Sequence, residues 1–227
     1  MNKKIKENNN VKKELIMDLP QVLVYGRGDK VPDNYLKINT TSKSSELWTR
    51  KFSPFLLGPV NVKPFDEIIE SKTLENAWQY SKRYKNHDLN EWQSWSQTGF
   101  SNPEAVRFPM GRGAKPMFSY HQGENLDYIE SRFKIYAPLY EKCIKDYAMD
   151  SFIKLKDLIS DGNNIALFDY DGYYHYGQGM SLEDVIYNPR RKMGHSFILL
   201  GMLTDDLFWK KDYNKEKIKN ISVPRLK

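Results

Sequence analysis

The chain of 227 residues is 40% hydrophobic, which favours one domain with a sizeable core, and its apolar run FILLGML (197–203) is far shorter than the ~20 residues that span a bilayer. Charges stand where a signal peptide would have its apolar run and Cys143 is the one cysteine, so we expect a cytoplasmic protein without zinc sites built on several cysteines. The net charge of +6 lies in the ends, with five Lys against three acidic residues in 1–20 and seven basic against two acidic in 210–227, which argues against a broad basic face for nucleic acid.

The first 18 residues are rich in Lys and Asn without a sustained apolar period, and we interpret residues 1–18 as a flexible basic arm. The folded domain is expected over residues 19–209, followed by a basic tail over 210–227. Its first strand is predicted in QVLVY (21–25), which the turn GRGDK ends. Aromatics mixed with Ser-Pro and Gly-Pro pairs in residues 46–60 are typical of an irregular loop that packs apolar side chains.

The segment SKTLENAWQYSKRY (71–84) is predicted to form one helix, capped by Ser71 or Thr73. A packed face is predicted from residues that recur at helical spacing, namely Leu74, Ala77, Trp78, Ser81 and Tyr84. Beside this face runs a polar stripe that includes Gln79.

Glu75 and Lys82 end this polar stripe, seven residues apart. On a helix they would lie nearly above one another, roughly 10 Å apart along the axis, which leaves room for a small ligand group. One interpretation is an amphipathic helix with solvated charges. The other is a catalytic face, on which the helix dipole keeps Glu75 ionised and the apolar Trp78 lowers the pKa of Lys82.

The middle of the chain is predicted to be mainly helical. Residues 86–107 suggest a short helix, a loop at 98–102 and a further helical turn at Pro103, and the Gly- and Pro-rich connector 108–117 follows. Residues 125–137 have helical spacing, and Pro138 is expected to start or kink a second helix.

The later part of the chain alternates a helix, a strand, an aromatic loop and a buried helix. The helix continues from Ser151 to a stop at Gly162, and NIALF (164–168) is predicted to be a strand. MGHSFILLGMLTDDLFW (193–209) is apolar enough to be a buried helix, in which Gly201 allows close packing.

Two further segments carry candidate chemistry. In MGRGAK (110–115), Gly111 and Gly113 flank Arg112, whose guanidinium suits a phosphate or carboxylate, although such a segment can also be an ordinary turn. The spacing is not that of a Walker loop.

The second segment is FDYDGYYHYGQG (168–179), which sets Asp169, Asp171 and His175 among tyrosines and glycines. The other histidines are scattered and no metal-ligand spacing is present, so neither a metal nor a cofactor is expected. The tyrosines suit stacking on a nucleobase, and a β-turn with a partly buried aromatic cluster is the alternative.

Taken in chain order, these segments resemble the NADAR (YbiA-like) family of small bacterial, phage and eukaryotic N-glycosidases. That family begins with a strand that ends in an aromatic residue, followed by a Ser-Asn-Phe element. Next comes Ser/Thr-x-Glu, with a Gln after it and a Lys seven residues after the Glu. Later motifs are Met-Gly-Arg, a Trp-Gly-x-Gly loop after an acidic residue, and a helix that starts with Asn-x-Leu-Gly. The corresponding segments here are VLVYG, FSPF, TLENAWQYSK, MGR, DGYYHYGQG and RKMGHSFILLGML, over roughly residues 21–204.

The resemblance implies a mainly helical α+β fold of one domain with a few short strands. It implies an enzyme without a cofactor that hydrolyses the bond between a ribose C1 and an amino group. The substrate would be ADP-ribosylated guanine in nucleic acid, or a ribosylamine nucleotide of the riboflavin pathway. No membrane partner is implied.

The resemblance also implies roles for individual residues. Glu75 or Asp171 would stabilise positive charge on the ribose or orient water, and Lys82 would protonate the departing base or attack C1. The implied substrate-binding residues are Phe55, Trp78, Gln79, Arg112, Tyr173, Tyr176 and Gly177. Glu75 and Lys82 are therefore predicted to project from one helix into a concave site that also receives Arg112 and loop 171–176.

The chain departs from the family pattern at three pocket positions, which hold Pro54, Tyr176 and Arg191 in place of Asn, Trp and Asn. The region 86–107 also looks longer than usual, as an insertion that covers the pocket or binds a partner would be. A competing interpretation is a non-catalytic, phage-like accessory protein that binds a nucleotide or nucleic acid in the same pocket. A scaffold with merely solvated charges is disfavoured because the motifs occur in family order.

Overall fold

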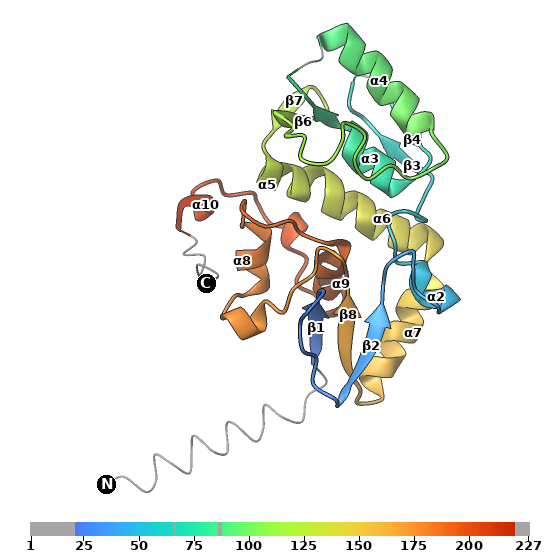
Figure 1. The fold of residues 1–227 in the computed structure, drawn as a ribbon, viewed down its shortest axis with the longest axis vertical. Helices are drawn as coiled ribbons and strands as arrows, with labels where there is room; N and C mark the ends of the chain where they lie inside the picture. The colour runs from blue at the N-terminus through green and yellow to red at the C-terminus, as the bar shows by residue number, and fades with distance from the viewer. Residues whose placement is uncertain (1–20, 66, 86–87, 221–227) are drawn as a thin grey trace, which may run out of the picture.

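A parallel three-stranded sheet forms one end of the molecule (Figure 1). Its strands are β1 (Val22–Tyr25), β8 (Asn164–Phe168) and β2 (Tyr35–Asn39), in the order β1-β8-β2. The two strands predicted from sequence are thereby confirmed as β1 and β8. The computed structural model describes residues 21–65, 67–85 and 88–220, so the arm predicted over 1–18 lies outside the described residues.

The three strands end level with one another. Tyr25 and Asn39 both pair with Phe168, so the chain leaves all three strands at the same edge. In sheets of parallel strands this carboxyl edge is where ligands bind. The fold therefore already indicates where a site should lie.

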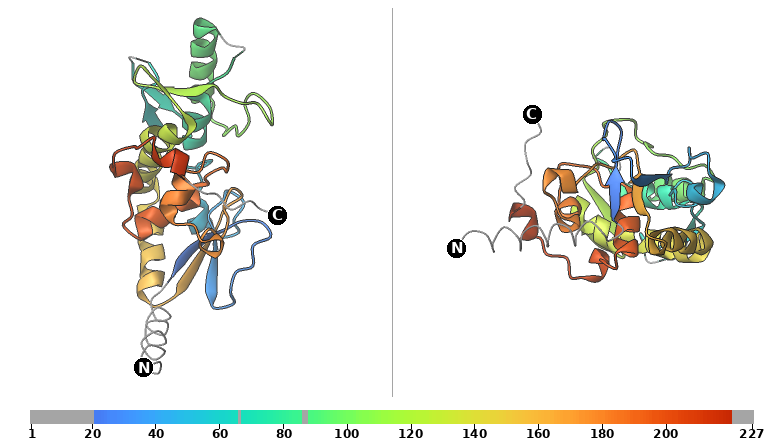
Figure 2. Two further views of the ribbon diagram at one scale, coloured as in Figure 1. Left: turned by 90° about the vertical axis from the view of Figure 1, so that its left-hand side faces the viewer. Right: turned by 90° about the horizontal axis from the view of Figure 1, so that it is seen from below.

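Two small antiparallel sheets lie toward the opposite end (Figures 1 and 2). One pairs β3 (Val60–Val62) with β4 (Ile69–Ser71), and the other has the order β5-β6-β7. The strands of the second sheet are β5 (Lys82–Arg83), β6 (Phe118–His121) and β7 (Glu124–Leu126). Next to them lie α3 (Leu74–Tyr80) and α4 (Leu89–Ser101).

A long helical segment crosses the middle of the molecule, between the parallel sheet and the smaller ones (Figure 1). It consists of α5 (Tyr128–Ser131), the π-helical turn η1 (Arg132–Tyr136) and α6 (Ala137–Tyr147). Pro138 lies in the first turn of α6, as predicted, and it has no N–H to donate to the preceding turn. The wider π turn immediately before it accommodates this missing bond without ending the helix.

The other helical elements are short or lie in the later part of the chain. They are α2 (Leu47–Arg50), α7 (Met149–Ser160), η2 (Tyr176–Gln178), α8 (Leu182–Ile186), α9 (His195–Leu203), η3 (Phe208–Lys210) and α10 (Lys217–Asn220). The helix predicted to stop at Gly162 is confirmed as α7, and Gly162 has a φ of 87°.

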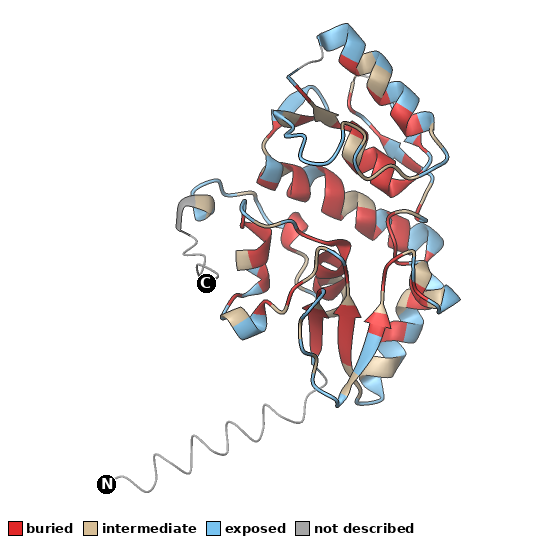
Figure 3. Cartoon of the chain, in the orientation of Figure 1, coloured by how far each residue is buried: buried red, intermediate tan, exposed pale blue. Residues whose placement is uncertain are grey.

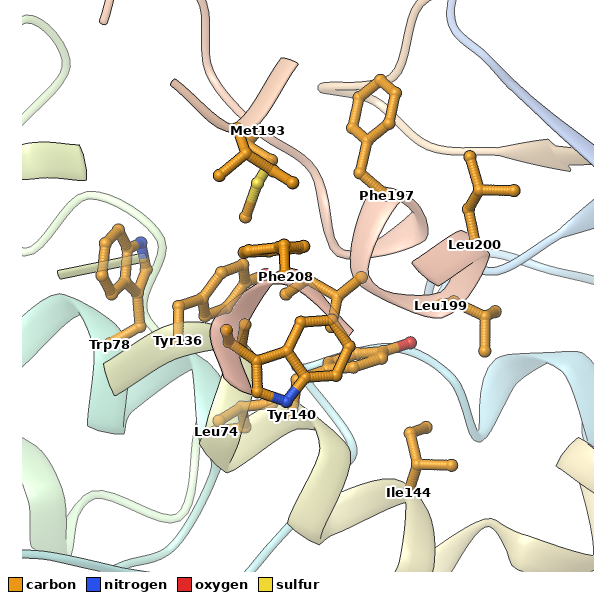
Figure 4. Packing of buried hydrophobic residues seen from close by; sticks show 14 of the residues in the cluster. Leu74, Trp78, Tyr136, Tyr140, Ile144, Met193, Phe197, Leu199, Leu200 and Phe208 are labelled. Atoms are coloured by element: carbon orange, nitrogen blue, oxygen red, sulfur yellow. The ribbon is translucent and has the colours of Figure 1, made fainter. Parts of the chain in front are cut away.

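The buried helix predicted over 193–209 is shorter in the structure, where α9 ends at Leu203. Its residues 195–201 are buried, and Figure 3 draws this helix mainly in red. A Cβ added to Gly201 would lie 2.8 Å from the carbonyl oxygen of Asp206, so the close packing predicted there is confirmed. Figure 4 shows how Phe197, Leu199 and Leu200 of α9 join the same core as Tyr140. The described residues thus form one α+β domain, and none of their helices is long and apolar enough to cross a membrane.

The prediction for residues 86–107 was wrong in detail. Residues 98–101 continue α4 as one helix of 13 residues, and Pro103 follows in a bend rather than a helical turn. Asp88 and Glu91 form a capping box at the start of this helix. Trp92 and Phe100 of α4 are fully buried, which fixes the helix against the domain.

The first part of the segment assigned to a basic tail packs on the domain. The Tyr213 hydroxyl donates to Asp127 over 2.8 Å, and its ring stacks on Tyr187. Lys217 also pairs with Glu183 over 2.5 Å. Residues 221–227 lie outside the described part of the chain.

His175 is buried with neither ring nitrogen hydrogen-bonded within the described residues, and it packs against Tyr176 and Phe197. Burial lowers the pKa of His175 to about 4, with the Asp184 carboxylate opposing the shift. Between pH 6.5 and about 4 the unfolded chain therefore binds a proton that the folded chain excludes. The contribution of this histidine favours folding above that window and is lost as the pH falls through it.

We expect His175→Leu, which is similar in volume, to reduce the loss of stability in acid. Urea unfolding at pH 7 and at pH 4.5 should show that the variant loses less free energy of unfolding than the wild type between the two values, by about 2 kcal/mol. Parallel pH dependences of the two proteins would contradict this account of His175.

Candidate functional site

A cavity of about 920 Å³ lies beyond the carboxyl edge of the parallel sheet. Its lining includes Thr41, just after β2, and Asp169, directly after β8. The deep part is formed by buried residues of α3, of η1, of the chain directly after β8 and of the start of α9, namely Glu75, Trp78, Tyr136, Asp169, Met193 and His195. Figure 4 shows Trp78 facing Tyr136, with Met193 above them.

The start of α3 is fixed by a cap and by the preceding loop. The Thr73 side chain accepts from the backbone N–H of Asn76, so Thr73 is the cap and Ser71 ends β4. The backbone N–H of Glu75 donates to the carbonyl of Pro54 over 2.9 Å, which brings Phe55 to the cavity wall. All five residues predicted for the packed face are buried.

The prediction that Glu75 and Lys82 share one helix was wrong, because α3 ends at Tyr80 and Lys82 begins β5. The carbonyl groups that a longer helix would need are bonded elsewhere. The Ser96 hydroxyl donates to the Tyr80 carbonyl, and the Trp92 indole N–H donates to the Lys82 carbonyl over 2.9 Å. Packing of α4 thus directs the chain from helix into strand at this point.

Glu75 and Lys82 nevertheless converge on the cavity, and Gln79 connects them. Gln79 Nε2 donates to Glu75 Oε1 over 2.8 Å, and Lys82 Nζ donates to Gln79 Oε1 over 2.7 Å. The Lys82 ammonium also lies 4.5 Å from the centre of the Trp78 ring. All four side chains line the cavity.

Burial shifts the pKa values of both groups toward their neutral forms. Desolvation raises the pKa of Glu75, opposed by its bond from Gln79 and by the charge of Lys82, and this direction is opposite to the one that the helix dipole alone predicts. Desolvation lowers the pKa of Lys82 to about 8, with Lys192 adding to the shift and Glu75 opposing it. The lowered pKa that was predicted beside Trp78 is thereby supported.

Asp171 also lines the cavity, but its charge is compensated. Its Oδ2 accepts from Arg107 Nη2 over 2.6 Å. Arg107 is held there by Asn76, whose amide binds the backbone of Asn102, Glu104 and Val106. The region 86–107 therefore delivers an arginine to the site, a contribution that sequence spacing did not reveal.

Exposed basic side chains line the outer part of the cavity. Among the described residues they have no acidic partner, and they are Lys43, Arg112, Lys115, Arg190 and Lys192. Arg112 and Lys192 lie 5.8 and 5.2 Å from the ring of Phe108. The predicted position of Arg112 in the concave site agrees with this arrangement.

Three predicted substrate-binding residues are not among those that line the cavity. Tyr173 is buried beneath Arg191, whose guanidinium lies 3.6 Å from the ring centre, and burial raises the pKa of this phenol to about 12. Tyr176 is half-exposed in η2, and Gly177 packs against the ring of Tyr174. The aromatic residues that do line the cavity include Trp78, Tyr128 and Tyr136.

A buried network behind the cavity was not predicted as a unit. His195 Nδ1 lies 2.9 Å from Asp169 Oδ2, and His195 Nε2 lies 3.0 Å from the Thr40 carbonyl. Nε2 also lies 2.9 Å from the Thr40 hydroxyl, whose own proton goes to the Phe168 carbonyl. Both ring nitrogens therefore face acceptors, an arrangement that the charged imidazolium fits. Burial alone would lower the pKa of His195, but the Asp169 carboxylate raises it, and the pKa of Asp169 falls to about 2 although burial opposes that shift.

Gly194 makes this network possible. A Cβ at this position would lie 2.2 Å from Asp169 Oδ2, so any other residue would displace the carboxylate. The sequence showed Asp169, Gly194 and His195 in separate motifs, but no spacing connected them. Among the described residues, no group of three or more His, Cys, Asp or Glu is placed to hold a metal ion.

Comparison with known proteins places the chain by sequence only. A model of a family of unknown function, DUF6939, matches residues 29–178. The chain belongs to this family. No curated protein and no solved structure matches it.

The range matched to DUF6939 contains most of the candidate site. It includes Glu75, Gln79, Lys82 and Arg107 and extends through the loop with Asp171. His195 and the segment before α9 lie beyond it. The matched range therefore supplies the residues at the centre of the cavity, while the residues of one wall lie outside it.

We expect Asp169→Asn to destabilise the protein by about 3–5 kcal/mol, because it leaves the buried His195 without its counter-charge. Asp150→Asn is the matched control: Asp150 is exposed and pairs with Lys51, so its loss should cost at most about 1 kcal/mol. Urea unfolding of the three proteins measures the difference. Equal costs for the two variants would show that the buried network does not stabilise the fold.

Proposed function

We propose that this protein is an N-glycosidase of the NADAR type, which hydrolyses the bond between a ribose C1 and a nitrogen. The substrates that fit are ADP-ribosylated guanine in nucleic acid and ribosylamine nucleotides. The observation that carries the proposal is the convergence of Glu75 and Lys82, bridged by Gln79, deep in a cavity whose outer part is basic.

Glu75 is the better placed of the two predicted catalytic carboxylates. Cleavage of an N-glycosidic bond builds positive charge on the ribose, and a fixed carboxylate in a site of low dielectric stabilises that charge. Asp171 is paired with the positive charge of Arg107, whereas Glu75 accepts its hydrogen bond from a neutral amide. The charge of Glu75 is therefore the one that no cation already compensates by direct contact.

Lys82 supports either chemical role of an amine. With a pKa of about 8, roughly a tenth of it is neutral near pH 7. The neutral amine can attack C1, while the electron pair of the broken C1–N bond leaves with the base nitrogen and that nitrogen takes the proton that the amine releases. The sugar then opens to an imine on Lys82, which borohydride would reduce and which water hydrolyses to free the sugar and the amine. The charged amine can instead protonate the departing nitrogen directly.

The remainder of the cavity suits a nucleotide. Arg112, Lys115 and Lys192 have no acidic partner among the described residues and offer donors to phosphate oxygens. Trp78, which packs 4.9 Å from Tyr136 between ring centres, offers an aromatic surface near the reacting groups. The cavity volume of about 920 Å³ lies within the usual range of pockets that bind small molecules and cofactors.

The decisive experiment is incubation with DNA that contains ADP-ribosylated guanine and, separately, with ribosylamine nucleotides of the riboflavin pathway. Release of ADP-ribose or ribose phosphate is the readout. We expect Glu75→Gln to slow release by ~10²-fold or more. Lys82→Arg should bind substrate but not turn it over, because the guanidinium keeps the charge and loses the nucleophile.

Glu70→Gln and Lys72→Arg are the matched controls, since these exposed residues pair with each other and do not line the cavity. Borohydride trapping of a substrate adduct on the wild type, absent from Lys82→Arg, would support attack on C1. Near-normal turnover by Lys82→Arg would contradict both chemical roles. Tight binding by the wild type without release of any product would favour the alternative of a nucleotide-binding accessory protein.

A further inference from the structure

The bridge from Glu75 through Gln79 to Lys82 has an unusual feature, because a neutral amide stands between two groups of opposite charge. The ion pairs of the described cavity residues are Arg107 with Asp171 and Asp169 with His195, and neither Glu75 nor Lys82 takes part in one. The direction of the amide is set by its neighbours. A lysine amine donates, so the amide oxygen faces Lys82 and the amide N–H faces Glu75.

A direct ion pair would be the expected arrangement for two such groups. Opposite charges attract more strongly in a buried site than in water, and the four-carbon stem of a lysine gives it reach. Gln79 occupies the space that this contact would need. It also satisfies one atom of each group with a hydrogen bond, so that the separation leaves neither group without a partner.

We propose that Gln79 is a positioning residue whose amide keeps Glu75 and Lys82 from closing into a direct ion pair, and thereby keeps both groups available to a ligand in the cavity. This role differs from the substrate contact that the sequence predicts for Gln79. The effect on turnover rests on the glycosidase function proposed above, whereas the spacing itself does not.

The charged groups around Lys82 come from several elements. Glu75 lies on α3, Asp171 lies in the loop after β8, and Lys192 lies in the segment before α9. Arg107 and His195 face Glu75. Because none of these groups is itself substituted in a Gln79 variant, a change in the titration of Lys82 reports on the loss of the spacer.

Two substitutions of Gln79 separate spacing from hydrogen bonding. Gln79→Ala opens the gap, so Glu75 and Lys82 should meet and the pKa of Lys82 should rise from about 8 toward its ordinary value of 10.5. Gln79→Leu removes the amide but fills the gap, so the pKa of Lys82 should not rise. The titration is followed by NMR on protein labelled at lysine Cε, with the Lys82 signal assigned by its absence from Lys82→Arg.

A double-mutant cycle excludes water entry as the cause of the rise. In a Glu75→Gln background the added Gln79→Ala substitution should no longer raise the pKa of Lys82, because the carboxylate that remains near it, that of Asp171, is already paired with Arg107. Gln97→Ala, at an exposed glutamine on α4, is the matched control and should leave the titration unchanged. A rise in both Gln79 variants, no rise in either, or a rise that persists without Glu75 would overturn the proposal.

The titration needs no substrate, so it is independent of the proposed reaction. If Lys82 titrates as expected and the wild type releases no product, the spacing role stands and the glycosidase proposal fails. If the wild type is active through attack by the neutral Lys82 amine, Gln79→Ala should shift the pH profile of kcat/KM toward higher pH and lower turnover near pH 7 by about tenfold or more. An active wild type whose Lys82 titration ignores Gln79→Ala would overturn the spacing role alone.

Discussion

The structure depends on satisfying one buried carboxylate, that of Asp169, where β8 leaves the parallel sheet. Its two oxygens accept from His195, from the backbone N–H of Ser196 and from that of Asp171. Through His195 the network reaches Thr40, so it joins the ends of β8 and β2 to the start of α9. An uncompensated charge there would cost several kcal/mol, and this requirement fixes the three elements that form the back of the cavity.

The other side of the cavity depends on where α3 stops. Because α4 supplies hydrogen bonds to the carbonyls of Tyr80 and Lys82, the chain leaves the helix before Lys82 and enters β5. The same region then returns through the segment that Asn76 holds and ends at Arg107, which neutralises Asp171. A segment that looks like an insertion in the sequence therefore decides the direction of Lys82 and supplies the ion-pair partner of Asp171.

Local sequence patterns predicted which helices and strands exist better than they predicted where each one ends. The apolar runs gave β1, β8 and α9, and the spacing from Leu74 to Tyr84 gave the buried face, because these features depend on burial along one segment. The end of α3 could not be predicted, since helix propensity and spacing continue past Tyr80 and only packing against α4 ends the helix. Similarly, Glu75 and Arg112 were located at the cavity from short motifs, but the Asp169–His195 pair joins residues 26 positions apart and has no local signal.

The tyrosines of the loop after β8 show that an aromatic-rich composition does not identify which side chains line a cavity. Tyr173 and Tyr176 were expected to stack on a base, yet Tyr173 supports Arg191, and Arg191 in turn donates to Gln178 over 2.7 Å. This contact braces the segment that leads to Lys192 and Met193, both of which do line the cavity. Aromatic residues near a site can therefore act through the backbone they hold in place. The cavity keeps its exposed cations without acidic partners in the described residues because its carboxylates are bound deeper inside, Asp169 to His195, Asp171 to Arg107 and Glu75 to Gln79. That arrangement leaves the positive charge to be met by the phosphates of an entering ligand.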